Sequence, residues 1–130
     1  MIIGIGSDIC AISRIREVLD RHDQRFIDRV FTNAEQEKAA AQDDPAATYA
    51  KRWAAKEACS KALGSGIAND VYLKDIGVVN GEGGVPTLAL TGGAAEMLSR
   101  IMPDGRMVKL HLSLSDDGDY AQAFVIIEAV

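Results

Sequence analysis

The residues best suited to chemistry are a carboxylate and an ammonium, Glu57 and Lys61, within the alanine-rich segment 52–66. Alanine forms helices readily and takes little room, so this helix is expected to pack closely against its neighbours. Glu57 and Lys61 are four residues apart and therefore share one helix face. Arg52 and Lys56 add two positive charges that could contact phosphates. Because an unpaired buried charge is costly, the segment predicts either ion pairs or a cleft for an anionic, metal-bound substrate.

A second carboxylate, Asp8, follows the apolar residues 2–6. We expect these residues to form a short buried strand and Asp8 to lie just past it, in a turn beside Gly6. Two carboxylates from separate elements, together with water and phosphate oxygens, suit Mg²⁺. On its own, Asp8 could equally be a turn or cap residue, and Glu57 with Lys61 could be an ordinary ion pair on a solvated face. The spacing leaves both interpretations open.

A basic stripe is predicted on the first helix, which should start at a Ser13 cap and run to about Val30. At about 100° per residue, three arginines fall on one side of this helix with an apolar residue at the edge. These residues are Arg14, Arg21, Arg25 and Val18. The stripe could be a solvated face, or it could bind an acidic helix of a partner protein. The net charge of −5 argues against a general nucleic-acid binder.

Hydrophobic periodicity and turn residues predict the remaining elements. They are a helix from the capping box 32–35, the alanine-rich helix ending at Gly64 and Gly66, strands 74–79 and 85–91, a helix from Thr91 to about Met102, and strands 107–114 and 120–128. We therefore expect one α+β domain, residues 1–130, with helices packed on a mainly antiparallel sheet. His22 falls on the apolar face of the first helix and is expected in the core, and His111 falls on the polar face of a strand.

Bulk properties exclude several classes of protein. Hydrophobic residues make up 48% of the chain and charged residues 25%, as in ordinary globular domains. Cys10 and Cys59 form no zinc motif or disulfide framework, and neither has an obvious partner base. No basic leader precedes the first apolar residues, and no apolar run approaches bilayer length. We expect a cytoplasmic protein that does not insert into membranes.

Taken together, these residues make the chain similar to the small bacterial type of 4′-phosphopantetheinyl transferase, the holo-[acyl-carrier-protein] synthases. The resemblance covers nearly the whole chain, and the motif in the alanine-rich helix is the specific one. The matching blocks are Gly4-Ile-Gly-Ser-Asp8 with Arg14, Phe31-Thr-x-x-Glu35, Arg52-Trp-Ala-Ala-Lys-Glu-Ala-x-x-Lys-Ala-Leu-Gly-x-Gly66, Gly84-x-Pro86, and Leu112-Ser-Leu-Ser-Asp116 followed by Tyr120-Ala and Phe124-Val.

The resemblance implies transfer of 4′-phosphopantetheine from coenzyme A to a serine of apo acyl carrier protein, with release of adenosine 3′,5′-bisphosphate. It implies Mg²⁺ ligands at Asp8 and Glu57, and catalytic roles for Glu57 and Lys61. It places Arg52, Lys61 and the turn Gly64, Ser65 and Gly66 near the phosphates of coenzyme A. The stripe Arg14, Val18, Arg21 and Arg25 would dock the acidic carrier protein. The resemblance also implies a homotrimer that binds coenzyme A across the subunit boundary.

One departure and two rival functions accompany this expectation. Many relatives have histidine where this chain has Asp116, so the resemblance gives that residue no role. A carrier-binding module without catalysis would need only the arginine stripe. A Mg²⁺-dependent nucleotide pyrophosphatase would use the same carboxylates with water in place of a carrier protein, but it would leave the stripe without a purpose.

Overall fold

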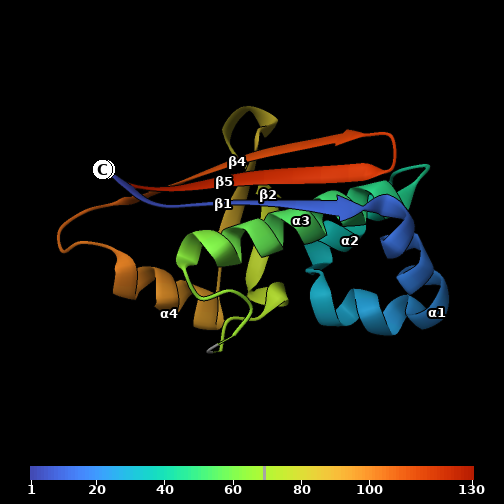
Figure 1. The fold of residues 1–130 in the computed structure, drawn as a ribbon, viewed down its shortest axis with the longest axis horizontal. Helices are drawn as coiled ribbons and strands as arrows, with labels where there is room; N and C mark the ends of the chain where they lie inside the picture. Colours follow the sequence, from blue (N-terminus) through green and yellow to red (C-terminus); the bar gives the residue numbers. More distant parts are fainter. Residues whose placement is uncertain (69) are drawn as a thin grey trace.

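Helices packed against antiparallel sheets make up the fold, as the sequence predicts (Figure 1). The computed structural model describes residues 1–68 and 70–130. In chain order the helices and strands are β1 (Ile2–Ala11), α1 (Ile12–Val30), α2 (Asn33–Ala40), α3 (Pro45–Leu63), β2 (Ile76–Asn80), β3 (Pro86–Leu90), α4 (Gly92–Ile101), β4 (Val108–Asp117) and β5 (Tyr120–Ala129). One sheet has the order β1-β5-β4, and β2 with β3 forms a separate hairpin.

Helix α3 is the centre of the molecule and lies along one face of the three-stranded sheet (Figure 1). Alternate residues of β5 point toward it and are fully buried, namely Ala121, Ala123, Val125 and Ile127. This is the period of two expected for a strand with one covered face. Most of α3 is buried as well, and its many alanines let the neighbouring elements come close.

Strand β1 approaches α3 so closely that it needs glycine at two positions. A Cβ atom added to Gly4 would lie 2.0 Å from the carbonyl oxygen of Ala62, and one added to Gly6 would lie 1.9 Å from that of Ala58. Neither separation is compatible with a side chain. These glycines are thus strand residues in backbone contact with α3. The prediction of a strand that stops at residue 6 is wrong.

Pairing with β5 extends β1 well past the expected turn. Asp8 stands opposite Ala123, and the ladder continues to Ala11 opposite Tyr120. Asp8 therefore lies inside a strand, half-buried on a fixed backbone, and not in a turn as expected. The last turn is also shorter than predicted, because β4 continues to Asp117 before the chain reverses.

The first helix differs from its prediction in three ways. Its N-cap residue is Ala11, not Ser13, and Ala11 provides no side-chain cap. The helix is kinked at Asp23, whose φ of 46° and ψ of −126° are not helical. His22, next to the kink, is exposed and not part of the core, because the apolar stripe of a straight helix does not continue through that point.

The ends of α2 and α3 confirm their predicted signals. Thr32 and Glu35 form the reciprocal capping box at the start of α2. Gly64 ends α3 in the left-handed conformation with φ 83°. The backbone N–H of Gly66 donates to the carbonyl of Ser60 at 3.1 Å, which satisfies one of the last free carbonyls of the helix.

A fully buried ion pair joins α2, α3 and β2. Lys56 Nζ lies 2.7 Å from Glu35 Oε1, and neither side chain is exposed to solvent. The ammonium also donates to the carbonyls of Leu73 and Ile76, at 3.1 and 2.7 Å. Glu35 accepts a further bond from the backbone N–H of Val78 at 2.8 Å. Lys56 is thus a structural residue, and the suggestion that it contacts phosphate is wrong.

Candidate active site

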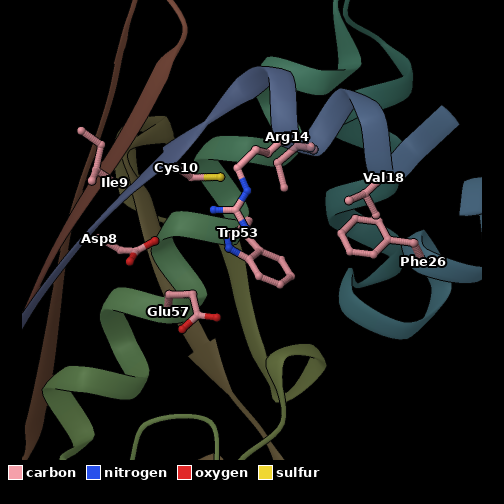
Figure 2. Close-up of a pocket in the computed structure, with 9 residues that line it drawn as sticks. Asp8, Ile9, Cys10, Arg14, Val18, Phe26, Trp53 and Glu57 are labelled. Carbon is pink, nitrogen blue, oxygen red and sulfur yellow. The ribbon is translucent and has the colours of Figure 1, made fainter. Parts of the chain in front are cut away.

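Two carboxylates face each other across the junction of β1 and α3. Asp8 comes from β1 and Glu57 from α3, and Figure 2 shows both side chains directed into the same pocket. The close contact of Gly4 and Gly6 with α3 sets this juxtaposition, since Asp8 follows two residues after Gly6 on the same strand. A sequence separation of almost fifty residues is thereby reduced to a shared cavity of about 350 Å³.

The electrostatics of Glu57 reflect this arrangement. Burial raises the pKa of Glu57 above its ordinary value, and the neighbouring Asp8 carboxylate raises it further, while Lys61 acts in the opposite direction. Both raising effects penalise the charged form of the acid. A cation between the two carboxylates would relieve that penalty, which makes the pair a candidate for metal binding.

Lys61 pairs with Asp8 and not with Glu57. Its Nζ donates to Asp8 Oδ1 at 3.1 Å and to the carbonyl oxygen of Ser7 at 3.0 Å. Its side chain is 53% exposed, whereas that of Asp8 is 18% exposed. The spacing of Glu57 and Lys61 thus places both residues near Asp8. Among the described residues, however, Lys61 forms an ion pair with Asp8 and none with Glu57. Lys61 does not line the pocket itself, but its ammonium is bonded to Asp8, which does, and it is accessible to an incoming anion.

The remainder of the pocket is largely apolar and comes from β1, α1 and α3. Figure 2 shows the guanidinium of Arg14 directed into it, Trp53 in the middle of the view and the ring of Phe26 on the side away from the carboxylates. These rings stack with their centroids 5.9 Å apart. The other lining residues are Ile9, Cys10, Ile15 and Val18. One end of the pocket therefore carries charge and the other presents aromatic and aliphatic surface.

Several predicted site residues lie outside this pocket. Arg52 is buried in a second pocket that Lys38 also lines, and its Nε has no hydrogen-bond partner among the described residues. Gly64, Ser65 and Gly66 form the end of α3, where Ser65 Oγ donates to the carbonyl of Gly66 at 2.8 Å.

The arginine stripe is only partly assembled as predicted. Arg14, Arg21 and Arg25 are all exposed, but the kink at Asp23 falls between the last two, so one helical wheel no longer relates them. Arg14 and Val18 reach the pocket that holds the carboxylates, whereas Arg21 and Arg25 do not line it.

Asp116 has a partner that explains its place in the fold. Its Oδ1 lies 3.1 Å from Nζ of Lys51 on α3, and the pair joins β4 to α3 at a partly exposed position. Cys59 is fully buried, and burial raises the pKa of its thiol to about 12, which confirms that it is a packing residue.

No role was predicted from the sequence for two aromatic residues of the pocket. Phe26 was not among the candidate residues, and Trp53 entered only as part of the motif in the alanine-rich helix. Trp53, Glu57 and Lys61 follow one another at intervals of four residues, so the helical period would have grouped the tryptophan with the charged pair. For Phe26 no such signal exists, since the kink at Asp23 determines where its ring lies.

The model of the 4′-phosphopantetheinyl transferase superfamily matches residues 4–125. The chain belongs to this superfamily. The match includes both carboxylates, Lys61 and the whole of α3. Similar members include a protein of Sphingopyxis alaskensis named holo-[acyl-carrier-protein] synthase, 59% identical over 131 residues, which cover all of this chain and 98% of that protein. A Brucella ovis protein of the same name is 55% identical over 130 residues, covering all of this chain and 97% of its own.

Solved structures of the superfamily share the fold. The holo-[acyl-carrier-protein] synthase of Neisseria meningitidis superposes with a TM-score of 0.83 at 35% identity, covering 98% of this chain and 99% of its own. That of Helicobacter pylori, solved in complex with coenzyme A, has a TM-score of 0.79 at 28% identity and covers 95% of this chain and 99% of its own. No helix among the described residues is both long and apolar enough to cross a membrane.

Proposed function

We propose that this chain transfers the 4′-phosphopantetheine group from coenzyme A to a serine of apo acyl carrier protein and releases adenosine 3′,5′-bisphosphate. The observation that carries the proposal is the grouping of Asp8 and Glu57 at one pocket, with Lys61 bonded to Asp8 and Arg14 directed into the pocket from the first helix. An acidic pair, an accessible ammonium and a guanidinium are the groups that phosphoryl transfer from a diphosphate requires. The names of the relatives and the coenzyme A complex of the Helicobacter pylori protein support it.

Asp8 and Glu57 would hold Mg²⁺. Burial and, after it, the Asp8 carboxylate raise the pKa of Glu57, and neither carboxylate is fully exposed. The described residues contain no group of three or more potential acidic, histidine or cysteine ligands. Two carboxylates supplemented by water and substrate oxygens are a usual environment for Mg²⁺. When bound there, the metal would withdraw charge from the diphosphate of coenzyme A.

The chain's own cations would act on the phosphates. Lys61 would exchange its contacts with Asp8 and Ser7 for the transferring phosphoryl group, a change that its exposed position allows. Glu57 could also accept the proton of the attacking serine. Gly64, Ser65 and Gly66 would bound the nucleotide end of coenzyme A.

Arg52 would serve the nucleotide of a neighbouring subunit. It does not share the pocket of Glu57, yet its buried Nε has no partner among the described residues. Such a group gains from an added acceptor. A homotrimer that binds coenzyme A across its subunit boundary would reconcile the two observations.

The uncovered face of the three-stranded sheet supports self-association. It carries Ile5, Ile9, Tyr120 and Phe124, which are between 41% and 66% exposed. Large apolar side chains gathered on one face indicate a protein interface. We propose that the homotrimer forms through this face and that the enzyme works in the cytoplasm, where carrier proteins of fatty acid synthesis would be its partners. Sedimentation equilibrium tests the assembly, and a monomer at micromolar concentration would exclude it.

The carrier protein would dock on α1. Arg14, Arg21 and Arg25 are exposed and complement an acidic helix, while Val18 offers an apolar contact at the mouth of the pocket. Association through these charges should weaken as salt is raised. The position of Arg14 and Val18 at the pocket would bring the carrier's serine to the carboxylates.

The deciding experiment incubates the protein with apo acyl carrier protein, coenzyme A and Mg²⁺ and measures the mass of the carrier. We expect a gain of one phosphopantetheine group and an equal amount of bisphosphate. An unchanged carrier mass with folded enzyme would refute the proposal. Parallel reactions without carrier or without Mg²⁺ separate the rivals. Bisphosphate release without carrier would indicate a pyrophosphatase, and carrier binding that ignores Mg²⁺ and yields no product would indicate a binding module.

A further inference from the structure

The N-terminus of α1 is capped by a residue from the other end of the chain. The backbone N–H of Ser13 donates to Asp119 Oδ1 at 2.9 Å, and the Ser13 hydroxyl donates to Asp119 Oδ2 at 2.6 Å. The N–H of Ile12 donates to the backbone carbonyl of Asp119 at 2.7 Å. Asp119 thus accepts three bonds, which satisfy the first two backbone N–H groups of the helix and the Ser13 hydroxyl, where Ala11 provides no side-chain cap.

Asp119 lies in the turn between β4 and β5, and β5 is the central strand of the sheet. The cap therefore joins the start of α1 to the turn that leads into the central strand of the sheet. Its carboxylate also carries negative charge at the positive end of the helix dipole. At this end α1 is joined covalently to the sheet through β1, since the helix begins directly after Ala11.

The cap lies beside the proposed active site. Arg14 follows Ser13 directly, and it lines the pocket together with Val18 one turn further on. The cap carboxylate therefore bonds Ser13, the residue directly before one that lines the pocket.

We propose that Asp119 is a positioning residue for carrier-protein binding, which fixes α1 so that Arg14 and Val18 stand at the mouth of the pocket. The inference rests on the proposed function, in which α1 docks the carrier. Asp119 itself contacts neither substrate. Its loss should weaken use of the carrier without weakening use of coenzyme A, because the carboxylates and α3 keep their own contacts.

The test compares Asp119→Ala, Asp119→Asn and the control Asp117→Ala, which removes a neighbouring exposed carboxylate whose side chain makes no hydrogen bond or ion pair among the described residues. Loss of a capping side chain should raise KM for apo carrier about three- to tenfold in Asp119→Ala. The KM for coenzyme A should stay within about twofold of the wild-type value. Asp119→Asn keeps an acceptor for the N–H of Ser13 and should recover most of the loss. Asp117→Ala should behave like the wild type.

Two further measurements keep the inference separable from the proposed function. Hydrogen exchange of the amides of residues 13–19 should be faster in Asp119→Ala than in the control, whether or not the protein is active. Ser13→Ala combined with Asp119→Ala should raise KM for carrier by less than the product of the single effects, because the two residues share a bond. An unchanged KM for carrier, or an equal rise for both substrates, would overturn the inference. If the wild-type protein shows the expected amide hydrogen exchange but transfers no phosphopantetheine, the proposed function is refuted instead.

Discussion

Two lysines of helix α3, Lys56 and Lys61, each pair with a carboxylate. The two pairs differ in how completely their neighbours compensate the charges. Lys56 pairs with Glu35, and neither is exposed. Lys61 pairs with Asp8 beside Glu57, and the lysine is 53% exposed. Lys56 and Glu57 are adjacent in sequence, yet their side chains leave the helix about 100° apart, one into the core and the other into the pocket.

The difference shows which charges hold the fold and which are available for chemistry. Lys56 has two carbonyl acceptors besides Glu35, and Glu35 has two backbone donors besides Lys56. Such a network has no capacity left for a ligand. At the other group, burial and Asp8 raise the pKa of Glu57, so its charge is not fully compensated. An incompletely compensated carboxylate in a cleft is typical of a functional site.

The largest effect should come from breaking the buried pair. Lys56→Met leaves Glu35 charged and unpaired in the core, which should lower the free energy of unfolding by about 3 to 5 kcal/mol. Denaturant titration followed by circular dichroism measures it. Lys51→Met is the matched control, because its pair with Asp116 is partly exposed and should contribute less than about 1 kcal/mol. Equal losses in the two variants would contradict the contrast.

Neutralising Glu57 or Asp8 should lower activity and should not lower stability. Glu57→Gln should lower the transfer rate at limiting Mg²⁺ by about a hundredfold or more, comparable to losing a strong electrostatic contact in a transition state. Because the fold raises the pKa of Glu57, the ionised carboxylate opposes folding as pH rises through that pKa. The metal-free variant should therefore melt no lower than the wild type. Asp8→Asn should show the same dependence on Mg²⁺, and full activity of either variant at limiting Mg²⁺ would exclude the ligand assignment.

A smaller effect should come from the contact that places Asp8 at the site. Gly6→Ala puts a Cβ atom against the carbonyl of Ala58 and should cost about 1 to 3 kcal/mol of stability, with a loss of activity as β1 moves away from α3. Gly77→Ala is the control, since its nearest neighbours would be 3.4 and 3.5 Å away, an ordinary contact. Thermal melting and transfer assays on both variants show whether the losses come from the close contact of β1 with α3 or from replacing any glycine by alanine.

The sequence predicted the parts of the fold that depend on local signals. The capping box of α2, the glycine that ends α3 and the alternation of β4 and β5 all involve residues close together in the chain. The grouping of Glu57 with Lys61 at the site also followed from helical spacing. These features need no knowledge of what lies opposite.

What the sequence could not predict depends on partners far along the chain. The local sequence predicted a turn at Gly6 and therefore at Asp8. Gly6 is required instead because the backbone of Ala58 lies against it, which the local sequence does not show. Ser13 was predicted as the N-cap of α1 from its residue type. The capping side chain is that of Asp119, which is 106 residues away and could not be identified from the local sequence. Helical spacing placed Glu57 and Lys61 on one face of α3, but Asp8 and not Glu57 bonds the lysine, since the pairing is set by the packing of β1 on α3.

The smallest change in stability should come from Lys61. Its pair with Asp8 is exposed on the lysine side, so Lys61→Met should alter the free energy of unfolding by less than about 1 kcal/mol. The same substitution should slow transfer by about tenfold to a hundredfold, because a cation near the reacting phosphate acts mainly in the transition state. Lys61→Arg keeps the charge in a planar group with different geometry and should recover only part of the rate. Stability from denaturant titration and rates from carrier mass, measured on the same preparations, test both statements. If Lys61→Met destabilised the fold as much as Lys56→Met, the exposed group would be structural too, and the distinction between the two lysines of α3 would fail.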